Sequence, residues 1–211
     1  MTGPNAVELL GYYGGDITHA ASAWTSTTRE MTPERIERIP KLFAMLAGET
    51  PRHETPFEKS MIHFLVRSDI ASHIHIIKHR IGVSVNAESA RYKELKEGNA
   101  YIPADWPERQ KEILRNHIAA SQARYHDTIA ELVGAGLDRK RAKESARFFL
   151  PYAAQITADV SFNFRSFVHF QELRNHPAAQ LEIREIAAEM LRLVKSIQGE
   201  PFKHSLQAFG L

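Results

Sequence analysis

Apolar residues follow two different spacings along the chain. Residues 7–13 and 61–66 are short apolar runs bounded by polar or turn-forming residues, and such runs predict strands. Ile183, Ile186 and Met190 recur at helical spacing, which predicts an amphipathic helix, and residues 36–46 show the same pattern. Further helices are predicted at 70–77, 107–133, 139–150, 163–174 and 176–197, and residues 82–86 are expected to be extended.

Residues that start or stop helices refine these boundaries. Thr32 and Pro33 form a typical helix start and Gly48 a typical end, so one helix is predicted between them. Pro40 falls inside it and predicts a kink, because proline has no backbone N–H to donate. Asp138 is expected to cap the helix that begins at residue 139.

The helix that follows the second predicted strand is expected to bury one apolar face. Ile70, Ile74 and Ile77 share that face, and Ser68 or Asp69 is expected to cap the helix. Long amphipathic helices beside a few strands indicate an α+β fold. No repeat or linker-like stretch interrupts the sequence, so a single domain over residues 1–211 is expected.

Composition and charge exclude several classes of protein. A hydrophobic share of 43% is typical of a folded chain and not of a disordered one. The 27 Lys and Arg against 25 Asp and Glu leave a net charge of +2, which argues against bulk electrostatic binding of nucleic acid. There is no cysteine, so disulfides, thiolate metal sites and cysteine nucleophiles are excluded. No apolar run reaches the roughly 18 residues of a membrane span and no signal peptide is expected, so we expect a cytoplasmic protein.

Histidines crowd the helix predicted at 70–77. His75 and His79 share a helical face, but His73 points about 160° away from His75, and no acidic residue is spaced to complete a zinc site. We therefore expect ordinary helix histidines and no metal site.

Two cationic clusters are candidates for an anion site. Lys78, His79 and Arg80 precede a run of Ser, Asn and Arg side chains, the types that wrap a phosphate, although a solvated charged loop has the same composition. Downstream, Arg165 and His169 share a helical face, while Arg174 lies about 180° round from Arg165. An ordinary polar interface would account equally well for this second cluster.

Arg147 lies in an apolar stretch, where a charge needs a partner, either a ligand anion or a glutamate. No Walker-type loop, GxGxxG turn or Gly-x-Ser-x-Gly elbow is present.

Taken together, four motifs resemble the flavin-dependent thymidylate synthases. They are HETPFE at 53–58, KHRIGVSVNAESARY at 78–92, ARFFLPYAA at 146–154 and NFRSFVHFQELRNHPAAQLEIRE at 163–185, in the family's order. Three departures stand out. Lys78 replaces the first Arg of the family signature, His75 stands where Gln is common, and one additional residue, around Gly82 and Val83, separates Arg80 from Ser89.

The resemblance implies a homotetramer of mixed α/β subunits, each with a small central antiparallel sheet flanked by long helices, with active sites at subunit contacts. It implies reductive methylation of a uridylate at C5, with FAD as cofactor, methylenetetrahydrofolate as carbon donor and NADPH as reductant. This chemistry needs no cysteine nucleophile. The acceptor is dUMP or, given the additional residue before Ser89, UMP.

The family's site residues carry over to matching positions. Arg174 is the expected catalytic residue, because a cation beside the pyrimidine favours the ionised ring and makes C5 more nucleophilic. The expected cofactor contacts are Ser26, Thr55, Lys78, His79, Arg80, Glu88, Asn163, Arg165 and His169. The expected nucleotide contacts are His75, Lys78, Ala87, Glu88, Ser89, Ala90, Arg91, Arg147 and Arg174, with Arg91 and Arg147 on the phosphate.

Two other functions compete with this interpretation. The first is a non-catalytic flavin- or nucleotide-binding homologue that acts as a scaffold or sensor. The second is a nucleic-acid binder that uses the arginines, against which the small net charge and the lack of an aromatic-studded basic stripe count.

Overall fold

The computed structural model describes residues 3–28, 30–89, 92, 94 and 99–211. Ala90 and Arg91, two of the expected nucleotide contacts, lie outside the described residues.

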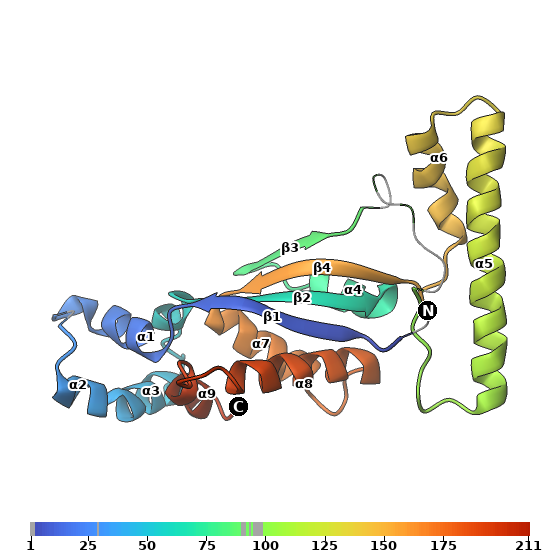
Figure 1. Cartoon of the computed structure of the whole chain (residues 1–211). Helices are drawn as coiled ribbons and strands as arrows, with labels where there is room; N and C mark the ends of the chain where they lie inside the picture. The colour runs from blue at the N-terminus through green and yellow to red at the C-terminus, as the bar shows by residue number, and fades with distance from the viewer. Residues whose placement is uncertain (1–2, 29, 90–91, 93, 95–98) are drawn as a thin grey trace. The chain divides into compact units, whose positions relative to one another are not determined.

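A four-stranded antiparallel sheet organises the chain (Figure 1). Its strands lie in the order β1-β2-β4-β3. In the central strands, side chains alternate between the two faces, so Ile62 and Phe64 of β2 and Val160 and Phe162 of β4 are fully buried. The α+β fold expected from the sequence is confirmed. The strands are β1 Ala6–Tyr13, β2 Met61–Asp69, β3 Val83–Ala87 and β4 Gln155–Phe162.

The chain divides into two compact units, and β2 and β4 contribute residues to both. The first unit comprises Met1–Ala6, Val66–Ile77 and Asn86–Ala158. The second comprises Val7–Leu65, Lys78–Val85 and Asp159–Leu211. The single domain expected from the sequence stays a prediction.

Three helices and a short 3-10 turn belong to the first unit: α4 Ile70–Ile77, α5 Glu108–Gly134, α6 Arg139–Ala146 and η3 Arg147–Phe149. Helix α5 packs on α6 through buried Tyr125 and Ile129 (Figure 1). Asp138 accepts hydrogen bonds from the backbone N–H groups of Lys140 and Arg141, so the predicted cap is confirmed.

One prediction for helix α4 of the first unit is wrong and another is confirmed. Helix α4 buries Ser72, His73 and Ile76, whereas Ile77 is 42% exposed, so the predicted isoleucine face is wrong. Asp69 does cap this helix, because its Oδ1 accepts from Ser72 N at 2.8 Å. The cap thus sets where the helix starts, but packing decides which side is buried.

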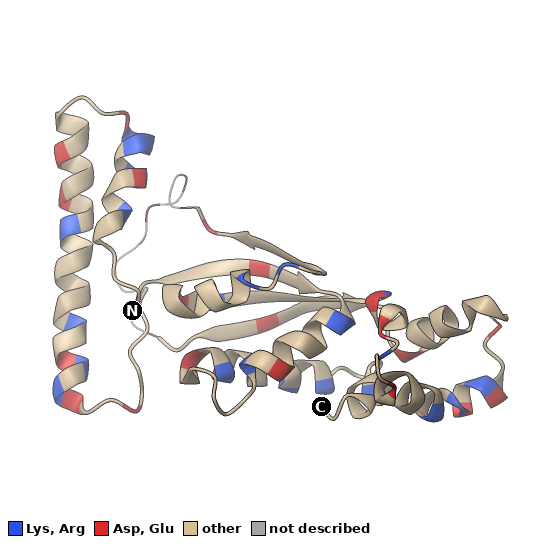
Figure 2. Ribbon diagram, turned by 180° about the vertical axis from the view of Figure 1, so that it is seen from behind, with Lys and Arg blue, Asp and Glu red and all other residues tan. Residues whose placement is uncertain are grey.

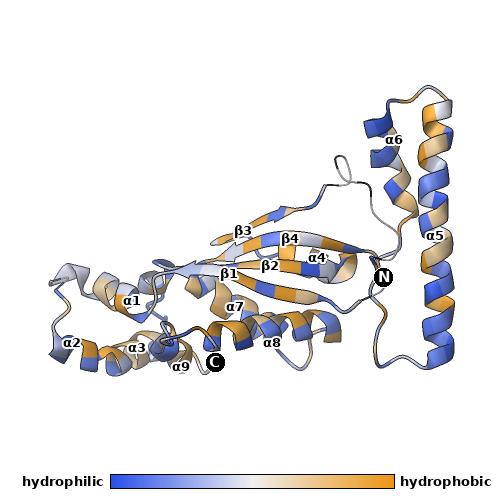
Figure 3. Cartoon of the chain, viewed as in Figure 1, coloured by the Kyte–Doolittle hydropathy of each residue, from blue (hydrophilic) through white to orange (hydrophobic). Residues whose placement is uncertain are grey.

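The other described helices belong to the second unit. They are α1 Asp16–Ala23, η1 Trp24–Ser26, α2 Pro33–Glu37, α3 Ile39–Gly48, η2 Thr55–Glu58, α7 Phe164–Arg174, α8 Leu181–Lys195 and α9 Lys203–Ala208. Helices α7 and α8 cover one side of the sheet (Figure 1). Apolar and polar residues alternate along α8 at helical spacing (Figure 3), and the predicted positions Ile183, Ile186 and Met190 are buried.

The kink predicted at Pro40 is instead a break between two helices. Helix α2 ends at Glu37 and α3 begins at Ile39, which puts Pro40 in the first turn of α3. Proline is tolerated there because the backbone N–H groups of a first turn need no partner inside the helix. The predicted end at Gly48 is confirmed.

Lys and Arg are interspersed with Asp and Glu along α5 and α8 (Figure 2). None of the helices among the described residues combines the length and the apolar run that crossing a membrane requires.

Candidate functional site

A cavity of about 420 Å³ lies between the loop that precedes β3 and helix α7, within the second unit. Two segments more than 80 residues apart in the sequence therefore meet, and these are the two cationic clusters singled out above. The cavity is lined by Lys78, His79, Arg80, Ile81, Val83, Ser166, His169, Leu173 and Arg174.

Helix α7 begins where this loop touches it. Asn163 is the N-cap, and its Oδ1 accepts a hydrogen bond from Ser166 N at 2.8 Å. Ser166 Oγ in turn donates to the carbonyl of Ile81 at 2.6 Å, and Asn163 N donates to the carbonyl of Gly82 at 2.9 Å. Loop and helix are thus joined by direct hydrogen bonds at the edge of the cavity.

His79 and Arg174 face each other in the cavity lining. Arg174 Nε donates to His79 Nε2 at 3.0 Å, and His79 is only 9% exposed. Because a guanidinium has no acceptor, this nitrogen of His79 carries no proton. The imidazole also packs edge-on against Phe170, with ring centroids 5.0 Å apart.

Arg165 is held on the outer side of α7 by two carboxylates. Its Nε donates to Glu54 at 2.9 Å and its Nη1 to Glu58 at 2.6 Å. The hydrogen bond to Glu58 raises the pKa of Arg165 above its ordinary value. Thr55 lies between these glutamates in η2, which brings the HETPFE motif to the same helix.

The remaining cofactor candidates are placed as follows. Ser26 ends η1 and is exposed, as are Thr55 and His169. Glu88, in the first unit, pairs with β4, because its N donates to Thr157 O at 2.8 Å and its carboxylate accepts from Thr157 N at 3.2 Å.

The expected nucleotide contacts divide between the two units. Lys78 and Arg174 line the cavity of the second unit. Arg147, at the start of η3, is exposed, and Ser89 O accepts from Tyr92 N at 3.0 Å. The members that belong to the first unit are His75, Ala87, Glu88, Ser89 and Arg147.

Sequence reasoning missed several residues of this site. Ser166 lines the cavity although no role was assigned to it, and Glu54 and Glu58 were not recognised as partners of Arg165. Helical spacing carried a signal for Ser166, because it lies three residues before His169 and seven before Leu173, on one face of α7.

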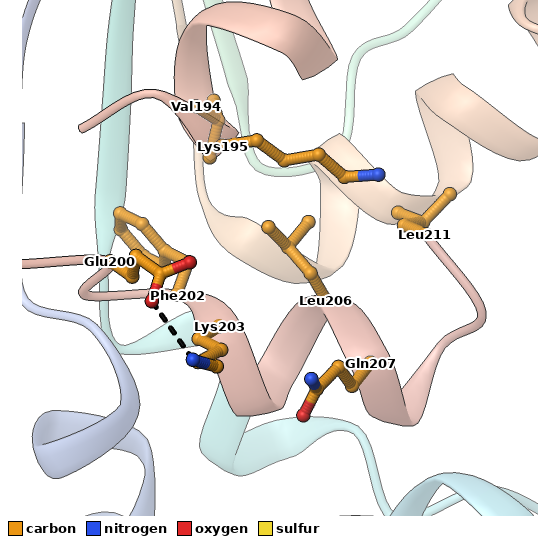
Figure 4. A pocket seen from close by; sticks show the side chains of 8 residues that line it. All are labelled: Val194, Lys195, Glu200, Phe202, Lys203, Leu206, Gln207 and Leu211. Atoms are coloured by element: carbon orange, nitrogen blue, oxygen red, sulfur yellow. Dashed lines mark hydrogen bonds and ion pairs between the residues drawn. The ribbon is translucent and has the colours of Figure 1, made fainter.

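Two further cavities contain none of the predicted residues. One of about 270 Å³ is lined by residues from the end of α8 to Leu211 (Figure 4). Another of about 760 Å³ includes Thr25 and Glu58 in its lining. Among the described residues, no group of three or more His, Asp or Glu side chains is placed to hold a metal ion.

Comparison with known proteins agrees with the motifs. Residues 8–198 match the family model described as thymidylate synthase complementing protein. The flavin-dependent thymidylate synthase of Pseudothermotoga lettingae is 31% identical over 199 residues, covering 90% of this chain and 85% of that protein. The flavin-dependent thymidylate synthase of Nitratidesulfovibrio vulgaris is 33% identical over 165 residues, covering 72% of this chain and 63% of that protein.

Solved structures show the same fold. The UMP/dUMP methylase PolB from Streptomyces cacaoi bound with 5-Br UMP superposes with a TM-score of 0.77 at 23% identity, covering all of this chain and 95% of that chain. The same methylase bound with 5-Br dUMP superposes with a TM-score of 0.79 at 24% identity, covering 99% of this chain and 96% of that chain. Because the family model spans most of the sequence, the chain belongs to the thymidylate synthase complementing protein family, that of the flavin-dependent thymidylate synthases, and is an enzyme.

Proposed function

We propose that this enzyme methylates C5 of a uridylate reductively, with FAD as cofactor, methylenetetrahydrofolate as carbon donor and NADPH as reductant. The observation that carries the proposal is the convergence of the Lys78–Arg80 segment and α7 on one cavity. The names of the relatives support the use of a flavin.

The residues of the cavity fit a flavin dinucleotide. Its phosphates are anionic, and Lys78 and Arg80 supply cations within one lining. Its ring system is flat and largely apolar, and Ile81 and Leu173 supply apolar surface beside those cations. When bound, the flavin supplies the hydride that the reductive methylation requires.

Arg174 is proposed to act on the pyrimidine. Its guanidinium stays charged, so it stabilises negative charge that develops on the ring without acting as a proton donor. The hydrogen bond from Arg174 Nε to His79 Nε2 constrains the orientation of the guanidinium.

The nucleotide phosphate is proposed to bind Arg91 and Arg147, with Ser89 as a further contact. Bidentate pairing suits two arginines on one phosphate. Of these, Ser89 and Arg147 are not among the described residues that line the cavity, which is consistent with the proposed homotetramer whose active sites form at subunit contacts. We also propose that the enzyme works in the cytoplasm.

The acceptor is proposed to be UMP as well as dUMP. Between Arg80 and Ser89 the chain carries one residue more than the family motif, in the stretch that leads to the nucleotide contacts. PolB, which shares the fold, has been crystallised with brominated forms of both nucleotides.

The test is to load the purified protein with FAD and supply methylenetetrahydrofolate and NADPH with either dUMP or UMP. Mass spectrometry of the nucleotide should then show the mass of one added methyl group in both reactions. Failure to take up FAD would overturn the proposal. FAD uptake without product from either nucleotide would overturn the methylation, and product from dUMP alone would refute only the choice of acceptor.

A further inference from the structure

Gly82 adopts a backbone conformation that side chains rarely take. Its φ is +65°, in the left-handed region, and it lies between Ile81 and Val83, which both line the cavity. It also belongs to the stretch that holds the additional residue before Ser89. We call residues 78–83, which lead into β3, the basic loop. Its backbone therefore turns at a glycine immediately beside the cavity.

The start of α7 leaves no room for a side chain at this position. A Cβ on Gly82 would lie 2.3 Å from Asn163 Nδ2 and 2.4 Å from Ser166 Oγ. Two other glycines with positive φ, Gly136 and Gly199, differ, because a Cβ on either would meet nothing within 4 Å. Close approach to α7, and not only backbone conformation, thus requires glycine at residue 82.

Hydrogen bonds also join Gly82 and its neighbour Ile81 to the start of α7. Gly82 O accepts from Asn163 N, Ile81 O accepts from Ser166 Oγ, and Asn163 Oδ1 accepts from Ser166 N. We call Ile81, Gly82, Asn163 and Ser166 the loop clamp. It fixes the backbone between Arg80 and Val83 at hydrogen-bond distance from the first turn of α7.

The clamp connects the two walls of the cavity. Arg80, Ile81 and Val83 line it from the loop, and Ser166 lines it from the helix. A displacement of the loop would therefore change the separation between the cations of the loop and those of α7, and a bound anion is sensitive to such displacements.

We propose that Gly82 and Ser166 are positioning residues that hold the basic loop against α7 and thereby set the affinity of the cavity for flavin. The proposal rests on the proposed function, because it assumes that the cavity takes the flavin. It goes further by assigning a role to Gly82 and Ser166, neither of which was among the expected site residues.

The experiment compares Ser166→Ala, Gly82→Ala and the double variant with the wild type as cofactor-free protein titrated with FAD. Each single variant should weaken FAD binding by about tenfold, the loss that one buried hydrogen bond or a small displacement produces. In the double variant the losses should not multiply, because Ser166 Oγ is one of the atoms that the new Cβ would meet, at 2.4 Å.

Gly199→Ala is the matched control. Gly199 has a φ of +81° and open space around its Cβ position, so the substitution introduces comparable backbone strain without a clash. It should lower the melting temperature and leave FAD affinity within about twofold of the wild type. Ser166→Ala introduces no strain and tests the clamp even if Gly82→Ala fails to fold.

Hydrogen exchange of the cofactor-free protein gives a readout that needs no flavin. In Ser166→Ala, the backbone amides of residues 80–83 and of Asn163 should exchange faster, whereas those of α8 should not change. Unchanged exchange, unchanged FAD affinity in both single variants, or fully multiplicative losses in the double variant would each overturn the inference. If the wild type takes up no flavin but hydrogen exchange in Ser166→Ala is faster as expected, the proposed function is overturned. The role of the clamp in flavin affinity is then overturned with it, whereas its role in holding the loop is supported.

Discussion

Arg174 Nε donates a hydrogen bond to His79 Nε2 across 3.0 Å. This bond joins the last residue of α7 to the middle residue of the Lys78–Arg80 segment. The contact keeps one nitrogen of a nearly buried imidazole unprotonated and holds one edge of the guanidinium. The cation that we propose to stabilise charge on the substrate ring is thereby held in place by a residue of the protein itself.

Arg174→Ala should reduce turnover at least about 100-fold, as loss of one charge-stabilising donor commonly does. Flavin should remain bound, because Lys78 and Arg80 still line the cavity. The measurement is methylated nucleotide per unit time, alongside flavin absorbance of the purified variant. Arg184→Ala is a control, since Arg184 is a partly buried arginine of the same unit whose Nη1 donates to the backbone carbonyl of Pro177. Methylation retained in Arg174→Ala would refute the role given to Arg174.

Arg165→Ala should weaken FAD binding by roughly tenfold at low salt, with a smaller difference at high salt because screening reduces surface electrostatics. Arg52→Ala is the matched control, because Arg52 also pairs with Glu54 but is not an expected cofactor contact. Fluorescence titrations at two ionic strengths measure both. Equal losses in the two variants would show that net charge, and not the position of Arg165, sets the affinity.

The free energy of unfolding should fall as the pH is lowered from about 6.5 towards about 3. Burial lowers the pKa of His19 from 6.5 to about 3, and its two ring nitrogens bond Ser205 Oγ and Ser60 Oγ at 2.8 and 2.7 Å. Between these pH values the unfolded chain binds a proton that the folded protein excludes, so acid favours unfolding. The slope should approach about 1.4 kcal/mol per pH unit for this group.

Denaturant titrations at several pH values measure that slope. His19→Gln should flatten it, and exposed His53→Gln should not. His73, whose pKa burial also lowers, contributes in the same direction and remains in both variants. An unchanged slope in His19→Gln would contradict the assignment.

Phe164→Ala should destabilise the folded chain by about 3–5 kcal/mol, the usual cost of removing a buried aromatic ring. Phe164 is fully buried and stacks on Phe202 with ring centroids 5.5 Å apart and planes 4° from parallel. Thermal or denaturant unfolding measures the loss. Phe148→Ala, on a side chain that is 82% exposed, should change stability by less than about 0.5 kcal/mol.

Local signals predicted the fold well where they were sufficient. The strands at β1 and β2 and the caps at Asp69 and Asp138 depend on a few neighbouring residues, and the structure has them. Strand β4 was not predicted, because its place between β2 and β3 depends on residues far away in the sequence. The buried face of α4 was predicted wrongly for a similar reason, since distant packing partners decide it.

For the site, spacing alone left a solvated charged loop as the alternative for the first cationic cluster and an ordinary polar interface as the alternative for the second. Their convergence could not be read from spacing, because it depends on how the loop before β3 meets α7. The pairing of Arg165 with Glu54 and Glu58 is likewise a contact between segments more than 100 residues apart. The family resemblance supplied the candidate residues, and the geometry adds what the described ones touch.

The position of Arg165 between two glutamates has a kinetic consequence. Two carboxylates pair with the Arg165 guanidinium, so the phosphate of the proposed cofactor would have to exchange with a carboxylate that is already in place. We therefore expect cofactor loading to behave as anion exchange, slowed by multivalent buffer anions that compete for the same guanidinium.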